Sequence, residues 1–309
     1  MTSVPNIDYE SIHNPNATQL VNDPKVTFVT SLFYLYNKEY DVNKTLSKRI
    51  EKFREIARQG IPICMYVSTD YMAEMLELIV EFPNNVRIMR VYDSVYSTNL
   101  VRACNDAKEM ALPGKRFESK DTIEYMYLMN CKAEFVYETI VSNPFNTAHF
   151  AWMDFSLSHV FLEELQPKQE ALDQMRDIAL GHFTQSQNPI MVIPGCWKYY
   201  NFGNKLEQKA NPTLLEKVQW RFCGGFFLGD AASLIQFYDF HMKYFPLFVE
   251  TNKTVTWEVN FWAWMECAVP EFRSLIEWYN ADHSESIVTN IPSKYRTQSQ
   301  EPQKEVISV

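Results

Sequence analysis

Apolar runs and helical segments alternate along the first hundred residues. The run at residues 25–33 is rich in β-branched and aromatic side chains, and further apolar runs follow at residues 61–68 and 85–92. Between them, residues 46–57 carry apolar side chains at three- and four-residue spacing, and residues 71–82 form the next expected helix. Strands that alternate with helices over short connections are typical of a parallel sheet covered by helices.

The second half of the chain continues this alternation less regularly. An irregular stretch, residues 93–120, precedes an expected helix at residues 122–141. That helix leads into the apolar run at residues 150–153, which predicts the fourth strand and ends abruptly at the carboxylate of Asp154. The remaining expected elements are a helix rich in Glu and Gln after Asp154, strands at residues 188–195, 220–230 and 274–280, and helices at residues 231–245 and 254–268.

These elements predict one α/β domain with a flanking segment at each end. The chain has 309 residues, 46% of them hydrophobic, so it can bury a large core. Chains of this length with alternating strands and helices often form one compact unit. We therefore expect a mostly parallel central sheet flanked by helices over residues 25–288. Residues 1–24 are expected to form an extended arm, and residues 289–309 a polar tail.

Charge and composition argue against several classes of protein. The net charge of −9 and the absence of a basic run argue against a nucleic-acid-binding surface. The polar N-terminus has no apolar signal-peptide core, and the sequence contains no apolar run of about 18 residues that could cross a membrane. The six cysteines are scattered without a CxxC pair, which favours reduced thiols over disulfides. We expect a cytoplasmic protein without a transmembrane segment.

Polar side chains near the carboxyl ends of the predicted strands indicate a candidate cleft. Thr30 and Ser31 lie in the first strand, and Asp93 follows the third. In open α/β sheets, ligands bind at these strand ends. Asp154, after the fourth strand, is either a turn or helix cap or a ligand-binding carboxylate. Ser156 completes a DxD-like pair that could hold Mn²⁺ or Mg²⁺ together with substrate phosphates.

Five further residues carry candidate chemistry. Gly224 and Gly225 lie in the predicted sixth strand, where glycine is costly unless a ligand passes close to the backbone or the strand bulges. Glu258, on an aromatic helix, either faces solvent or contacts sugar hydroxyls above a floor of indole rings. Lys132 is either solvated or directed at the cleft, where it could neutralise a phosphate. His283 becomes relevant if the tail folds back over the end of the fourth strand.

Several longer segments resemble one known family. The segments are YLMNCKAEFV, NPFNTAHFAWMDFSLSHVF, RFCGGFFLGD, WEVNFWAW and WYNADHSES, and they are similar to segments of the HtrL/YibB family, whose members are regarded as glycosyltransferases. The resemblance covers roughly residues 25–288. The order of elements is similar to that of the GT-A fold, with a layout like that of glycogenin-type retaining enzymes. The resemblance therefore implies a GT-A-like, Rossmann-like α/β fold.

The same resemblance implies a nucleotide-sugar donor site at the strand ends. Lys132 would touch the donor phosphate or sugar, and Gly224 and Gly225 would lie under the transferred sugar. The residues implied to cradle the base and ribose are Thr30, Ser31, Leu32 and Tyr34.

A metal ion and an acidic residue complete the implied site. Asp154 would bind Mn²⁺, or Mg²⁺, that bridges the donor diphosphate, and His283 would complete the metal shell. Ser156 stands where GT-A enzymes often have a second Asp, which puts strict metal dependence in doubt. Glu258 would occupy the place of the acidic residue that contacts the sugar.

The predicted activity is metal-assisted transfer of a hexose-type sugar from a nucleotide sugar, expected to be a UDP-sugar. The acceptor would be a hydroxyl of a glycan, a protein or a sugar-lipid. The glycogenin-like layout favours retention, whereas inversion would use Glu258 as the general base. The alternative is an inactive GT-A-like carbohydrate-binding or interaction protein, which the neutral Ser156 would fit. A phosphoryl-transfer enzyme of the haloacid-dehalogenase type fits less well, because its Asp pair would stand on the first strand, at Thr30 and Ser31.

Overall fold

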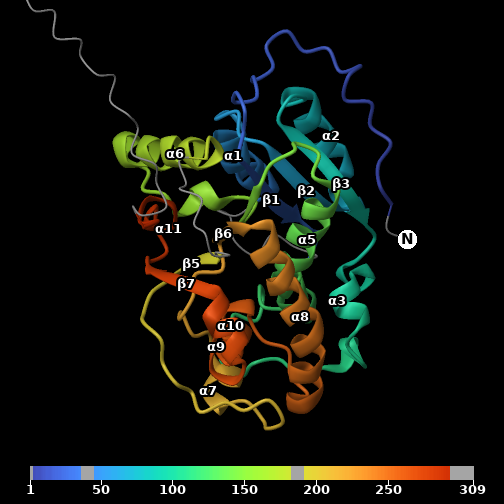
Figure 1. The fold of residues 1–309 in the computed structure, drawn as a ribbon. Helices are drawn as coiled ribbons and strands as arrows, with labels where there is room; N and C mark the ends of the chain where they lie inside the picture. Colours follow the sequence, from blue (N-terminus) through green and yellow to red (C-terminus); the bar gives the residue numbers. More distant parts are fainter. Residues whose placement is uncertain (1–2, 36–44, 182–190, 293–309) are drawn as a thin grey trace, which may run out of the picture.

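One seven-stranded sheet runs through the protein. The structure is a computed structural model that describes residues 3–35, 45–181 and 191–292. The strands are β1 (Val26–Leu32), β2 (Ile63–Ser68), β3 (Val86–Tyr92), β4 (His149–Met153), β5 (Met191–Gly195), β6 (Phe226–Asp230) and β7 (Ile276–Asn280). They lie in the order β3-β2-β1-β4-β6-β5-β7, with β6 antiparallel to both neighbours and every other pairing parallel (Figure 1). The predicted α/β fold, a mostly parallel central sheet flanked by helices, is confirmed.

Helices cover both faces of this sheet. The α-helices are α1 (Leu46–Ala57), α2 (Met72–Glu81), α3 (Asn99–Arg102), α4 (Ile123–Asn130), α5 (Lys132–Ser142), α6 (Leu165–Ala179), α7 (Pro212–Glu216), α8 (Ala231–Asn252), α9 (Glu258–Ala268), α10 (Pro270–Leu275) and α11 (Ser286–Thr289). Short 3₁₀ helices are η1 (Thr69–Tyr71), η2 (Val95–Ser97), η3 (Ala107–Glu109) and η4 (Leu157–Val160).

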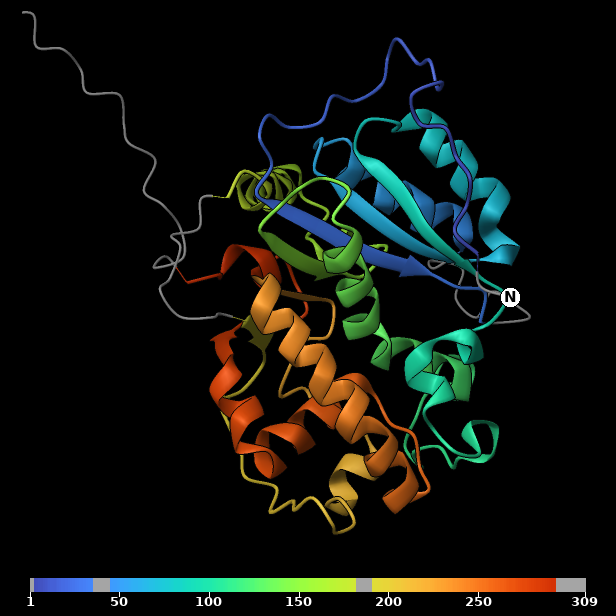
Figure 2. The ribbon, with the colours of Figure 1, turned by 45° about the vertical axis from the view of Figure 1, so that its right-hand side comes forward.

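Two hydrophobic clusters, one on each face of the sheet, hold the layers together. Successive residues of β1 alternate between them, since Phe28 belongs to one cluster and Val29 to the other. This alternation is the two-residue period of a strand that is buried on both faces. Helices α1, α2 and α6 supply apolar side chains to the cluster around Phe28, whereas α5, α8 and α9 supply those around Val29. The result is a three-layer α/β arrangement (Figures 1 and 2).

Several predicted elements differ in extent from those observed. Helix α8 continues through Pro246 to Asn252, beyond the expected end at residue 245, and α9 begins at Glu258 rather than at residue 254. The expected helix at residues 122–141 is divided into α4 and α5, because the chain tightens at Cys131, whose amide donates to the carbonyls of both Tyr127 and Leu128. The expected strand at residues 220–230 is also shorter, since β6 begins only at Phe226. The prediction that Gly224 and Gly225 lie inside a strand is therefore wrong; they lie in the turn that precedes β6.

The first residues of the N-terminal arm lie along the outer strand β3, and the arm then continues past α2 (Figure 1, dark blue). Ser3 forms an isolated antiparallel bridge with Val91, and the amide of Ile88 donates to the hydroxyl of Tyr9. The predicted polar tail is described only as far as residue 292, and residues 188–190 of the expected fifth strand also lie outside the described residues. Within the described ranges, every helix is too short or too polar to cross a membrane.

Candidate functional site

Lys132, the first residue of α5, is the centre of a buried charged network. Its Nζ lies 2.8 Å from Oε1 of Glu258 and 3.0 Å from Oδ1 of Asp154. It also donates a hydrogen bond of 2.8 Å to the carbonyl oxygen of Gly224. These contacts match the three N–H donors of an ammonium group, and the side chain is only 1% exposed. We call Lys132, Asp154, Glu258 and the Gly224 carbonyl the Lys132 network.

The network keeps Lys132 and Asp154 in their charged forms. Burial alone would lower the pKa of Lys132, but the charges of Asp154 and Glu258 outweigh burial, so the pKa lies above its ordinary value. Burial would likewise raise the pKa of Asp154. The charge of Lys132 and hydrogen bonds from Lys132 and the Trp152 indole outweigh it, and the pKa lies below its usual range. A buried charge is tolerable only when it is paired in this way.

The two glycines before β6 differ in how closely the Lys132 network approaches them. A Cβ atom on Gly224 would lie 2.0 Å from Oε1 of Glu258, far inside van der Waals contact. A Cβ atom on Gly225 would lie 3.4 Å from Leu157 and 3.6 Å from Oδ2 of Asp154, which is close to ordinary contact. The sequence left a passing ligand and a β-bulge as explanations for these glycines. For Gly224 the structure gives a different reason, the close approach of the Glu258 carboxylate.

A cleft of about 560 Å³ opens at the carboxyl ends of β1 and β4. Ser31, Asp154 and Ser156 line it. Asp154 connects the cleft to the Lys132 network, because it contacts Lys132 on one side and lines the cleft on the other. Its side chain is 38% exposed. Its Oδ1 accepts from the Trp152 indole at 3.0 Å and faces Lys132, whereas no hydrogen bond from a described residue reaches its Oδ2. Asp154 is thus neither a turn residue alone nor a simple helix cap.

Basic side chains of α1 line the same cleft. Lys48 and Arg49 lie in the first turn, whereas Lys52, paired with Glu163 at 2.8 Å, lies further along the helix. In the cleft these three lie together with Lys120, so that the lining holds four basic and three acidic side chains. The first turn of α1 has no acidic residue. Cations at a helix N-terminus oppose the helix dipole, so an anion in the cleft would relieve an unfavourable arrangement. Sequence reasoning missed these residues, although the run of cations at a predicted helix start was the available signal.

The other predicted donor-binding residues lie outside the lining of the cleft. The side chains of Thr30 and Leu32 are fully buried in the sheet. Tyr34 is exposed just beyond β1, where its amide donates to the hydroxyl of Ser68 and its ring meets the edge of Tyr71.

The indole rings near Glu258 belong to the core. Trp262 and Trp264 are fully buried on α9, and Trp257 is nearly so. They pack against α8, where the Nε1–H of Trp262 donates to Nε2 of His241 at 2.9 Å. Within the described residues, these rings therefore form no exposed stacking floor for a sugar.

His283 lies in a group of its own. Its ring meets Trp220 edge-on with centroids 4.1 Å apart, and it lies beside the thiols of Cys196 and Cys223. Burial lowers the pKa of His283, although Asp282, Asp154 and Glu258 partly compensate by their charge. The two carboxylates of the Lys132 network thus affect the pKa of His283 through their charge.

The fold and the site define an α/β protein with a partly cationic cleft at the strand ends and a lysine-bridged carboxylate pair behind it. The sequence matches the family model HtrL_YibB, described as a bacterial protein of unknown function, over residues 85–256. Because this match covers more than half of the chain, the protein belongs to the HtrL/YibB family, as the resemblance of its segments predicted. The match includes Lys132, Asp154 and Gly224.

Solved structures with similar folds are distant in sequence. Mouse xyloside xylosyltransferase 1 shares 9% identity at a TM-score of 0.40, over 84% of this chain and 85% of that one. The 4-diphosphocytidyl-2C-methyl-D-erythritol synthase from Anaerococcus prevotii shares 8% at 0.38, over 87% and 92%. HddC from Yersinia pseudotuberculosis shares 10% at 0.34, over 84% and 90%. No curated protein sequence matches the chain. Similarities this low carry no argument about function.

Proposed function

We propose that this protein is a glycosyltransferase that moves a hexose-type sugar from a nucleotide sugar, a UDP-sugar in the first instance, to a hydroxyl acceptor. The observation that carries the proposal is the position of Asp154. One of its carboxylate oxygens faces the buried Lys132, and its side chain reaches a partly cationic cleft at the strand ends. Ligands of α/β proteins bind at this edge of the sheet.

The cleft suits a nucleoside diphosphate. Its volume of about 560 Å³ lies within the usual range of small-molecule sites. Lys48, Arg49 and Lys120 supply positive charge for phosphates, and the rings of Phe33 and Tyr125 supply an apolar wall for a base. A local excess of basic side chains is needed here, because the whole chain carries a net charge of −9.

Asp154 and Ser156 fit a divalent ion that also binds the donor phosphates. The Oδ2 atom of Asp154 is not engaged by described residues, and the hydroxyl of Ser156 lies along the same cleft. Mg²⁺ and Mn²⁺ are commonly held by one or two carboxylates together with substrate phosphates. When bound, the ion would neutralise charge on the leaving diphosphate. The predicted third ligand, His283, lies beside two thiols, whose soft sulphur atoms favour a different ion.

Glu258 is better placed to position the sugar than to remove a proton. It is nearly buried, and its Oε1 accepts from Lys132 at 2.8 Å. A general base needs to reach the acceptor hydroxyl directly or through one water molecule. Because the Lys132 ammonium holds one oxygen of the Glu258 carboxylate, we expect Glu258 to position the sugar. This role agrees with retention of configuration at the transferred sugar. Lys132 would hold both Glu258 and Asp154 in place during transfer.

An inactive carbohydrate-binding protein is the second candidate. The observation that favours it is that Lys132 already forms an ion pair with each of the two carboxylates without any ligand. Ser156, which is neutral, also provides less charge for a metal than a second Asp would. In this case the cleft would bind a sugar or nucleotide without turning it over.

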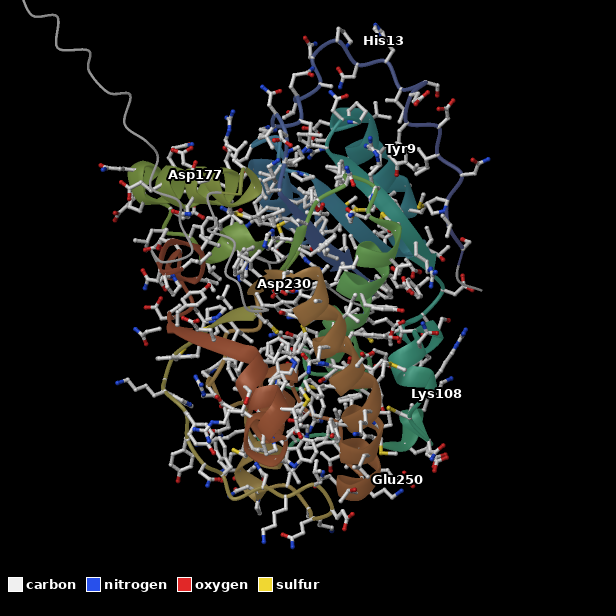
Figure 3. All side chains as sticks on the ribbon, viewed as in Figure 1. Tyr9, His13, Lys108, Asp177, Asp230 and Glu250 are labelled. Atoms are coloured by element: carbon white, nitrogen blue, oxygen red, sulfur yellow. The ribbon has the colours of Figure 1, made fainter. Side chains whose placement is uncertain are left out.

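A panel of nucleotide sugars, tested with and without Mn²⁺, separates these proposals. We expect one donor class to raise the melting temperature by several degrees, because a ligand at 100 times its Kd adds about 2.7 kcal/mol of stability. Mn²⁺ should increase the shift, and Asp154→Ala should remove most of it. The matched control is Asp177→Ala on the exposed face of α6 (Figure 3). Equal shifts in both variants, or none with any donor, would reject the donor-site proposal.

A further inference from the structure

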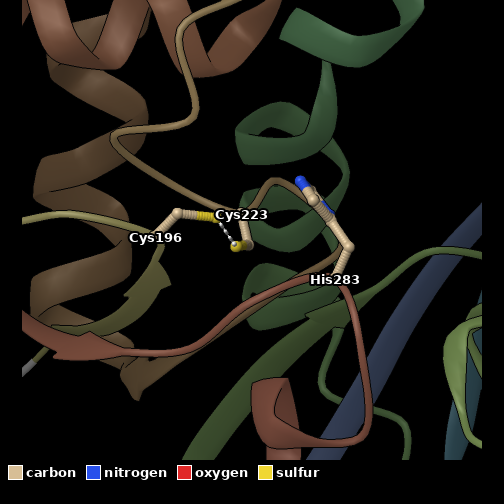
Figure 4. A group of neighbouring side chains, drawn as sticks. All are labelled: Cys196, Cys223 and His283. Carbon is tan, nitrogen blue, oxygen red and sulfur yellow. Dashed lines mark hydrogen bonds between the residues drawn. The ribbon is translucent and has the colours of Figure 1, made fainter.

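Two cysteines and a histidine from three separate segments meet beside the Lys132 network. Cys196 directly follows β5, Cys223 lies in the turn before β6, and His283 lies shortly after β7 (Figure 4). The Sγ atoms of Cys196 and Cys223 are 3.7 Å apart. An imidazole nitrogen of His283 completes the group, and all three ligand atoms lie within 4.8 Å of one another.

The spacing of these atoms fits a tetrahedral metal ion. With Zn–S bonds of about 2.3 Å, two thiolates on one tetrahedral Zn²⁺ lie about 3.8 Å apart, close to the 3.7 Å observed. A disulfide would instead need the sulphur atoms at about 2.05 Å. A nitrogen ligand on the same ion would lie about 3.6 Å from each sulphur atom. The ligand atoms lie within 4.8 Å of one another, so the partly exposed imidazole of His283 would have to move by at most about 1.2 Å to reach this distance of about 3.6 Å.

We propose that Cys196, Cys223 and His283 bind one Zn²⁺ ion. Thiolates and imidazole are the ligands that Zn²⁺ prefers, whereas Mn²⁺ and Mg²⁺ prefer oxygen. Three protein ligands leave a fourth position, which water can fill from the exposed side of His283. This site is separate from the proposed donor site and assigns His283 to a different ion from the one that Asp154 would hold.

Zinc binding would fix the backbone next to the Lys132 network. Cys223 directly precedes Gly224, whose carbonyl accepts from Lys132. The ion would also join the ends of β5 and β7 to the turn before β6. A metal that binds only the folded chain stabilises it. The ion would thus act on the proposed transfer by holding Gly224 in place, without contacting the reacting atoms.

Zinc titration of the full chain tests this proposal. The protein is stripped with a chelator under reducing conditions and titrated with Zn²⁺ in competition with a chromophoric chelator. We expect one ion per chain and a rise in melting temperature. Co²⁺ in place of Zn²⁺ should give sulphur-to-metal charge-transfer absorption. Cys196→Ser and His283→Ala should each weaken zinc binding at least tenfold, whereas Cys267→Ser, at another half-buried thiol, should not.

Three results would overturn the zinc site. One is the absence of stoichiometric binding, and another is binding that Cys196→Ser, His283→Ala and Cys267→Ser leave equally strong. The third is a Cys196–Cys223 disulfide in protein kept without reductant, together with no zinc binding after reduction. Cys196→Ser changes a partly buried side chain and His283→Ala a partly exposed one, so both variants should fold, which their melting curves would show. Nucleotide-sugar binding is measured separately, so failure of the zinc site leaves the donor proposal standing.

Discussion

Lys132 faces two carboxylates and donates to one carbonyl while it is almost completely removed from solvent. Such a network contributes little net stability compared with apolar packing, because each charge loses its hydration. Removing Lys132 is a different matter, since it leaves Glu258 buried and takes the cation away from both carboxylates. At the scale of single residues, removal of Lys132 should therefore lower the free energy of unfolding by more than the intact network contributes to it.

Lys132→Met should destabilise the fold by about 3–5 kcal/mol, because Asp154 and Glu258 would lose the cation between them. Urea unfolding followed by circular dichroism measures the change. Lys198→Met, at an exposed lysine, is the control and should stay within about 0.5 kcal/mol of wild type. Equal stability of the two variants would show that the network is not held together by charge.

Gly224→Ala should cost about 1–3 kcal/mol, and Gly225→Ala clearly less, because only the first Cβ collides with Glu258. The same unfolding measurement gives both values. Adding Gly224→Ala to a Glu258→Ala background should cost much less than adding it to wild type, since the colliding carboxylate is then absent. An unchanged cost in that background would mean that the glycine is needed for another reason.

At the scale of secondary-structure elements, the sequence predicted most of what local periodicity controls. The order of strands and helices and the end of β4 at Asp154 follow from apolar spacing and were confirmed. The break at Cys131 and the late start of β6 at Phe226 were not predicted. The turn before β6 involves a tertiary contact that the sequence does not show, because Glu258, which crowds Gly224, lies on a helix that comes later in the chain. The break at Cys131 is local, since the Cys131 amide donates to the carbonyls of Tyr127 and Leu128, but apolar spacing runs through it without interruption.

The packing of α8 against α9 should make the protein sensitive to acid. Nδ1 of His241 donates to the carbonyl of Phe237, and Nε2 accepts from Trp262, so the ring is held neutral. Burial lowers the pKa of His241 to about 4, from 6.5. Between these values the unfolded chain binds a proton that the folded chain does not. Stability should therefore fall by roughly 3 kcal/mol as pH falls from above 6.5 to 4.

Urea unfolding at several pH values between 7.5 and 4 checks this sign and size. His241→Gln has no titrating ring, so its stability should fall less over the same interval than that of the wild type. The comparison removes the contribution of the carboxylates, which both proteins share. Parallel pH curves for the two proteins would contradict the assignment.

At the scale of the whole molecule, residues far apart in the chain meet at one edge of the sheet. Lys132, Asp154, Gly224 and Glu258 were named from the sequence, partly through the family resemblance, and the structure brings them together. The basic side chains of α1 were missed, because cations on an amphipathic helix usually form its solvated face. The grouping of Cys196 with Cys223 was also beyond sequence reasoning, since nothing local links two scattered cysteines.

The cations at the start of α1 should strengthen the binding of a phosphate ligand and lower the stability of the ligand-free protein. Arg49→Gln should weaken binding of UDP about tenfold through loss of a charged hydrogen bond. It should also stabilise the ligand-free protein by about 0.3–1 kcal/mol, because it removes a cation from a helix N-terminus. Isothermal titration at two salt concentrations and urea unfolding measure the two effects.

Arg58→Gln, at the C-terminal end of the same helix, is the matched control. It should leave UDP binding unchanged and should not stabilise the protein, since a cation at that end favours the helix. If Arg49→Gln and Arg58→Gln behave alike, the cleft does not use its basic side chains to bind phosphate.

Sugar transfer by this protein would be seen as turnover of the donor. Wild type and Asp154→Asn are incubated with UDP-sugars, Mn²⁺ and a mixture of glycan acceptors, and release of UDP is followed by chromatography. We expect UDP release from at least one donor by wild type, reduced at least about 100-fold in Asp154→Asn because the leaving diphosphate is no longer stabilised. Binding of a donor without release of UDP, in wild type and variant alike, would contradict sugar transfer and favour the inactive carbohydrate-binding protein.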